Sequence, residues 1–169
     1  RLSVLDEPFV AAQSPESAAP IHNVDGSFVR EWLVLGPFPG KGLETDFLAG
    51  VGGEANVRPR EGDTVTTSDG RRLTWTRLRS SNDNVSLEAA LGIQQWAVAY
   101  AYCELNSDQP HESDVRAAYE GNGASVRLNG EEIGTLPAHV DRNLDIDAVL
   151  PVHLKAGRNA CLLKLAVAQ

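Results

Sequence analysis

Two adjacent glutamates, Glu131 and Glu132, are the first residues in the sequence whose types and spacing suggest catalysis. A pair of carboxylates that faces one substrate is the arrangement that hydrolyses glycosidic bonds. The pair follows Asn129-Gly130, however, which is typical of the tight turn of a β-hairpin. Successive side chains on a strand point to opposite faces of a sheet, so the two carboxylates cannot act on one bond. The pattern predicts the solvent-exposed edge of a hairpin.

Clustered acidic and amide side chains could instead bind calcium. Asp145 and Asp147 share one face if residues 141–147 are extended, and they are the candidate metal ligands; the pattern favours the alternative, a solvated strand edge. Residues 82–84, with the sequence Asn-Asp-Asn, lack the glycine and the distal glutamate of an EF-hand loop and are more typical of an Asx turn. We therefore expect no required cofactor and keep structural calcium as an alternative.

Other common catalytic and metal-binding patterns are missing from the sequence. The histidines have neither a partner four residues away nor a nearby cysteine pair, so no zinc site is predicted. No G-x-S-x-G segment occurs. Residues 36–42 have too few residues between their glycines for a phosphate-binding loop. The sequence therefore predicts a domain that is not an enzyme.

A carbohydrate-binding surface needs an exposed aromatic ring to stack on a sugar. Trp32, Trp75 and Trp96 all lie inside strand patterns, which favours the core for each of them. If one is exposed, the sequence favours Trp75, because its neighbours Leu73 and Arg77 make that face only partly apolar. Trp75 is therefore the candidate stacking platform.

Polar groups that could recognise sugar hydroxyls lie in and after the loop at residues 119–123. Glu120 and Asn122 lie in this loop, and Arg127 follows it closely. An ordinary tight connection between two strands is the favoured alternative. With Trp75, these three residues make up the candidate ligand-binding set.

Many short strand patterns and little helix surround these residues. About eight strands predict an all-β fold, namely a two-sheet antiparallel β-sandwich of the jelly-roll type with at most short helical turns. Residues 96–106 are apolar on both faces, which predicts a central strand covered on both sides. Ser86 and Gly92 could cap a short helix between them. We expect an N-terminal arm or linker over 1–24 and a single domain over 25–169.

Charge and hydropathy limit the partners. The chain has 169 residues and a net charge of −8, and no basic block is present to bind a phosphate backbone. Its apolar runs fall far short of the ~20 residues of a spanning helix. We therefore expect neither nucleic-acid binding nor membrane insertion. The chain begins at Arg1 and contains no methionine, which is typical of a piece of a longer or processed protein.

Five segments in order resemble the galactose-binding-like jelly-roll modules of large, mostly extracytoplasmic, multidomain bacterial proteins. They are WLVLGPFPG (32–40), LTW (73–75), AYAYCEL (99–105), VRLNGEEI (126–133) and LPVHLKAGRNACLLKLAV (150–167). The resemblance implies a non-catalytic carbohydrate-binding module that targets a secreted, periplasmic or cell-surface protein to a polysaccharide, and that sometimes contains calcium. The alternative is a structural or protein-interaction domain that packs against neighbouring domains of the parent chain. The chain departs from the commoner pattern at EGNGASVRLNG (120–130), where many relatives have a Ser-Asp-Asp-Gly run and an aromatic residue.

The resemblance also implies that the two cysteines lie on neighbouring strands. In such folds the strand that here contains Cys103 often lies beside the last strand, which contains Cys161. The two side chains could then face each other. A disulfide and two buried free thiols both remain open.

Overall fold

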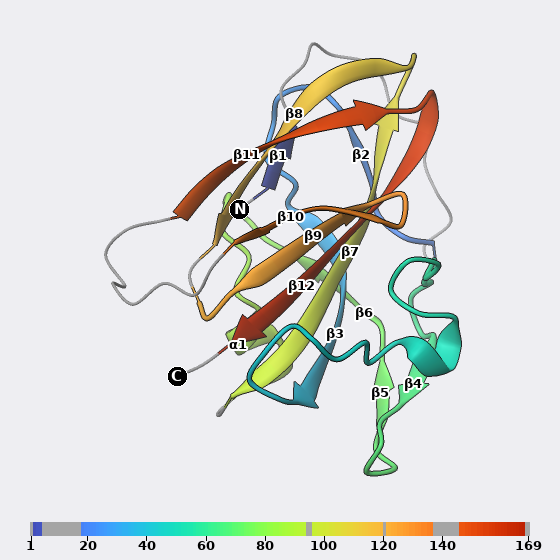
Figure 1. Cartoon of the computed structure of the whole chain (residues 1–169), viewed down its shortest axis with the longest axis vertical. Coiled ribbons are helices and arrows are strands. Elements are labelled where there is room, and N and C mark those ends of the chain that lie inside the picture. Colours follow the sequence, from blue (N-terminus) through green and yellow to red (C-terminus); the bar gives the residue numbers. More distant parts are fainter. Residues whose placement is uncertain (1, 5–17, 94–95, 120, 137–145, 168–169) are drawn as a thin grey trace.

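The computed structural model describes residues 2–4, 18–93, 96–119, 121–136 and 146–167. The structure is mostly strand (52%) with 6% helix, and its antiparallel sheets pack together as a β-sandwich (Figure 1). The predicted all-β class with few helical turns is therefore confirmed.

The larger sheet contains the predicted central strand. Its strand order is β10 (Glu131–Leu136), β9 (Ala124–Leu128), β12 (Gly157–Val167), β7 (Ala97–Ser107), β3 (Glu31–Pro39) and β6 (Thr76–Arg79), with β2 (Ile21–Asn23) also paired to β7. All pairs are antiparallel except β2 with β7. β7 lies in the middle, and side chains on both of its faces are buried, as its two apolar faces predict.

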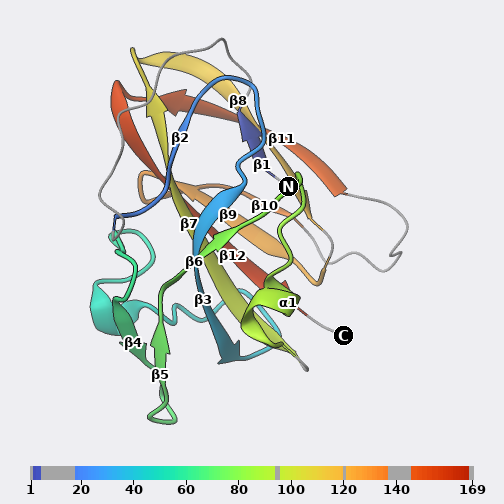
Figure 2. The ribbon, with the colours of Figure 1, turned by 180° about the vertical axis from the view of Figure 1, so that it is seen from behind.

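The smaller sheet covers one face of the larger sheet. Its order is β1 (Leu2–Val4), β8 (His111–Tyr119) and β11 (Ile146–Leu154), and these strands lie together at the upper end in Figures 1 and 2. Val115 of β8 and Leu154 of β11 are buried in one core with Cys103 and Leu105 of β7. This contact between the two sheets is the hydrophobic layer of the sandwich.

β1 and β2 come from the segment 1–24 that the sequence predicts as an arm or linker. β1 pairs antiparallel with β8, and β2 pairs parallel with β7. Residues 2–4 and 21–23 thus belong to the two sheets, because their backbone groups find partners there.

The second face of the larger sheet is covered by a long loop and a hairpin. The loop at 40–63 contains the short 3-10 helix η1 (Ala49–Val51) and leads into the hairpin of β4 (Thr64–Thr66) and β5 (Arg72–Thr74), at the lower end in Figure 2. Leu48 and Val65 from this layer share a core with Leu35 and Leu162 of the sheet. A second hydrophobic layer therefore lies on this side.

Trp75 is buried in that second layer, with 1% of its surface exposed. Its backbone N–H donates to the carbonyl of Asp63, and its carbonyl accepts from the N–H of Gly62. The favoured prediction, that Trp75 lies in the core, is therefore confirmed, and the alternative that it is the exposed tryptophan is wrong. Its face is only partly apolar along the strand, but the loop supplies the missing cover.

Two local predictions from turn and cap chemistry are confirmed. In the β9–β10 hairpin, Asn129 and Gly130 both have positive φ (53° and 92°), and Glu131 and Glu132 are exposed at its edge. The short helix α1 (Leu87–Leu91) begins at Ser86, whose hydroxyl accepts from a backbone N–H, and it ends at a left-handed glycine.

Candidate functional site

A buried ion pair fastens the loop 40–63 to the larger sheet. Nζ of Lys164, from β12, lies 2.7 Å from Oε1 of Glu54 in the loop, and the two side chains are 3% and 8% exposed. The same ammonium donates to the carbonyls of Leu43 at 2.7 Å and Thr45 at 2.6 Å. An ammonium has three N–H donors, so these acceptors satisfy it fully. One lysine therefore holds two separate parts of the loop.

Tyr100 and Arg127 complete this buried polar cluster around Glu54. The Tyr100 hydroxyl donates to Oε1 of Glu54 at 2.7 Å and accepts from the N–H of Phe47 at 3.2 Å. Burial, and then the neighbouring Glu54 carboxylate, raise the pKa of Tyr100 well above its usual value. Nε of Arg127 lies 3.4 Å from Oε2 of Glu54, and its Nη2 lies 3.2 Å from Oε2 of Glu132. Two cations therefore face two carboxylates.

The geometry gives the buried polar cluster a structural role. A nucleophilic lysine must lose its proton and reach a substrate. Lys164 is instead almost fully buried, and its ammonium is enclosed by a carboxylate and two carbonyls, so no substrate can reach it. What the cluster can do is hold the loop in one conformation over the sheet.

The candidate ligand-binding residues do not form an exposed platform. Trp75 is buried, and Arg127 is held by two carboxylates. Asn122 is half-buried, and its backbone N–H donates to the carbonyl of Ala166 at 3.0 Å. Glu120 lies outside the described residues. The arrangement offers polar groups but no open ring beside them.

Trp96 is exposed instead, which the strand pattern did not predict. It immediately precedes β7 and is 43% exposed, whereas Trp32 is 4% exposed and belongs to the core. Nζ of Lys41, at the start of the loop 40–63, lies 5.3 Å from the centroid of the Trp96 ring. An indole and an ammonium therefore lie together on the surface at the end of the sheet, and we call them the Trp96 surface.

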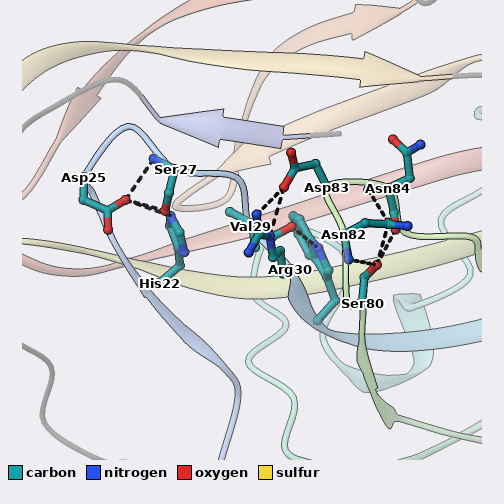
Figure 3. Close-up of polar contacts among 10 residues, drawn as sticks. His22, Asp25, Ser27, Val29, Arg30, Ser80, Asn82, Asp83 and Asn84 are labelled. Carbon is teal, nitrogen blue, oxygen red and sulfur yellow. Dashed lines mark hydrogen bonds and ion pairs between the residues drawn. The ribbon is translucent and has the colours of Figure 1, made fainter.

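The side chains of Asn82 and Asp83 take part in a cluster of hydrogen bonds on the surface (Figure 3). The N–H of Asn84 donates to Oδ1 of Asn82 at 3.0 Å, which is an Asx turn and confirms that prediction. Asp83 accepts from the Arg30 guanidinium, at 2.9 Å from Nε and 2.6 Å from Nη2. The acidic group of the segment is thus neutralised by an arginine.

His22, Asp25 and Ser27 also lie together in Figure 3, but they cannot act as a catalytic triad. In a triad the acid and the serine contact different nitrogens of the histidine ring. Here the same nitrogen, Nε2 of His22, lies 3.5 Å from Oγ of Ser27 and 3.7 Å from Oδ1 of Asp25. The serine hydroxyl donates directly to Asp25. The trio therefore stabilises the turn at Asp25-Gly26.

The candidate calcium ligands fall largely outside the described part of the chain. Asp145 lies in the undescribed range 137–145, and of Asp147 only the backbone is described, paired with Ala118. Within the described residues, no group of three or more His, Cys, Asp or Glu side chains could hold a metal ion. Calcium at Asp145 and Asp147 stays a prediction.

Cys103 and Cys161 lie directly opposite each other on β7 and β12, and both are buried free thiols in the structure. The N–H of Asn129 donates to the carbonyl of Ala160, so the backbone groups of Ala160 face β9 and those of Cys161 face β7. The cysteines therefore form a hydrogen-bonded antiparallel pair. In such a pair the Cα atoms are about 5.5 Å apart, and the side chains lie further apart than in a non-hydrogen-bonded pair. A disulfide usually joins Cα atoms about 4.4–6.8 Å apart, so this register would allow a bond. In the structure both cysteines are nevertheless free thiols.

We expect thiol titration in denaturant, without reductant, to find both cysteines free in protein purified in air. Burial, and then the neighbouring Cys161 thiol, raise the pKa of Cys103. Both side chains are buried, so reagents should not reach either thiol in the native protein. Absence of free thiols, with an intact mass lower by two hydrogen atoms, would show the disulfide instead.

Comparisons with known proteins identify no relative of this chain. No family model, no curated protein and no solved structure matches it. In the described residues, the structure contains no helix long and apolar enough to cross a membrane. The function must therefore be argued from the residues themselves.

Proposed function

We propose that this chain is a non-catalytic carbohydrate-binding module that targets a larger extracytoplasmic protein to a polysaccharide. The observation that carries the proposal is the exposure of Trp96, at 43% of its surface, at the end of the central strand. A large apolar ring in contact with water can stack on the C–H face of a pyranose, while its edge and polar neighbours meet the hydroxyls.

The loop that flanks Trp96 supports the proposal because it is held rigidly. The buried polar cluster fixes its carbonyls at Leu43 and Thr45, and Phe47 stacks on Phe38 with ring centroids 4.9 Å apart. A surface that is already in its bound conformation loses less entropy when a ligand binds. A shallow site of this kind binds with about −4 to −8 kcal/mol, or millimolar to micromolar affinity.

Calorimetric titration against a panel of oligosaccharides and soluble polysaccharides tests the proposal. We expect saturable binding that Trp96→Ala abolishes and Trp96→Phe partly retains, because phenylalanine keeps a ring but a smaller one. Val149→Ala is the matched control, since it also removes exposed apolar surface but lies on β11 in the smaller sheet. Repeating the titration in calcium and in EDTA tests the structural ion. Lack of binding across a broad panel would refute the proposal.

A second candidate function rests on the outer face of the smaller sheet. Val149 is 51% exposed, and Pro151, two residues further on the same face of β11, is also exposed. They lie opposite Arg116 and Asp114 of β8, so a small apolar patch has charged neighbours. Such a patch fits a domain that packs against a neighbour in the parent chain. The test is whether Val149→Asp weakens association with the rest of the parent protein while sugar binding is absent.

A further inference from the structure

We infer that the Trp96 surface selects a sugar that carries a carboxylate, such as a uronic acid unit of an acidic polysaccharide. The inference rests on the proposed function and adds the ligand class. It comes from Lys41, whose ammonium lies 5.3 Å from the centre of the exposed indole.

Lys41 is a cation without a carboxylate partner among the described residues. Lys164 and Arg127, by contrast, each form an ion pair with Glu54. The net charge of the chain is −8, so acidic side chains outnumber basic ones. The carboxylate of Glu44 folds over Gly42, beside Lys41 in the sequence, but among the described residues no ion pair joins it to the ammonium. The ammonium beside the exposed ring can therefore attract an anionic group.

The backbone that carries Lys41 is fixed on both sides. On one side, β3 ends at Pro39, which pairs with Ala97 of β7. On the other side, the carbonyl of Leu43 accepts a hydrogen bond from Lys164. The lysine is thus presented from a rigid segment, which reduces the entropy lost on binding.

The two groups together match the parts of a uronic acid. The ammonium of Lys41 lies over one face of the indole, so a pyranose ring stacks there once the flexible lysine side chain moves to the rim of the ring. From the rim the ammonium can donate charge-assisted hydrogen bonds to the carboxylate on C6. Such bonds are roughly twice as strong as those to a neutral hydroxyl. A methyl ester of the same sugar keeps the shape but loses the charge, so it is the matched competitor.

The test compares short acidic oligosaccharides with their methyl esters by calorimetric titration, for galacturonate, glucuronoxylan and alginate series. Short chains are used because the net charge of −8 repels a long polyanion. We expect at least one acid to bind about two- to fivefold more tightly than its ester at low salt, as for an exposed ion pair. The difference should disappear at about 1 M salt, where the Debye length is about 3 Å.

Variants assign the preference to Lys41. Lys41→Gln should bind acid and ester equally, and Lys41→Arg should restore the preference. Lys155→Gln is the charge-matched control, because Lys155 is also exposed but precedes β12, at the end of the sheet opposite Trp96. Its preference for the acid should be unchanged.

The outcomes separate this inference from the proposed function. Binding that requires Trp96 but shows no preference for any acid over its ester would overturn the inference and leave the proposed function standing. A preference that survives in Lys41→Gln would also overturn it. Lack of binding to every neutral and acidic sugar would overturn both.

Discussion

Replacing Lys164 by methionine is expected to lower the free energy of unfolding by about 3–5 kcal/mol. Methionine fills a similar volume but removes the charge that faces Glu54. The carboxylate would then remain buried with Arg127 as its nearest cation, at 3.4 Å, and the carbonyls of Leu43 and Thr45 would lose their donor. A buried carboxylate that loses the nearer of its two cations, and buried carbonyls that lose their donor, are both costly.

Urea denaturation of a double-mutant cycle measures this effect. Glu54→Gln removes the opposite charge, and the double variant Lys164→Met/Glu54→Gln should lose less stability than the sum of the two single variants, because no charge is left alone. The exposed Lys155→Met should change stability by less than about 0.5 kcal/mol. A loss below about 1 kcal/mol in Lys164→Met would mean that water or a rearranged loop replaces the ion pair.

Replacing Asn159 by alanine is expected to cost about 3 kcal/mol. This side chain is fully buried and takes part in five hydrogen bonds. Its Nδ2 donates to the carbonyls of Lys155, Gly157 and Leu105, and its Oδ1 accepts from the N–H of Lys155 and from Nδ2 of Asn129. Alanine would leave several of these buried groups without a partner, each at a cost of about 1–3 kcal/mol before relaxation.

The control for Asn159 is Asn56→Ala. Asn56 is exposed, and its side chain donates to the carbonyl of Gly52 at 3.0 Å on the surface. Its loss should cost no more than about 1 kcal/mol, because water can replace the bond. Denaturation that finds equal losses for the two variants would contradict a special role for the buried asparagine.

Features of the fold set by local chemistry could be predicted from the sequence. The turn at Asn129-Gly130 and the cap at Ser86 follow from residue types at fixed positions. The central position of residues 96–106 follows from their two apolar faces. Each of these signals needs only a few neighbouring residues.

The buried polar cluster could not be predicted, because it depends on where a long loop comes to rest. Lys164 alternates with the buried Leu162 and Ala166 on the second face of β12, which was a signal that its side chain would be enclosed. Its partner Glu54 lies 110 residues earlier in the loop, and no spacing rule joins the two. The pairing is a result of tertiary structure.

The exposure of the tryptophans also depends on tertiary structure and could not be predicted from the strand patterns. Alternation predicts that Trp96 lies on the face with Val98 and Tyr100, but β7 begins only at Ala97, and Trp96 is not part of the core on that face. It cannot tell where the covering layer ends, and that layer encloses Trp75 but leaves Trp96 open. The candidate stacking platform was therefore placed on an indole that is buried.

The hairpin edge also affects how the protein behaves at high concentration. β10 is the last strand of the larger sheet, and a free strand edge can recruit a strand from another molecule and start aggregation. Here the register shifts between Glu132 and Gly134, which interrupts the regular ladder, and two exposed carboxylates lie beside that irregularity. Glu132 is paired with Arg127, so Glu131 is the carboxylate that neighbouring copies would present to one another at this edge. The irregularity and this charge thus help to keep copies from joining edge to edge at high concentration.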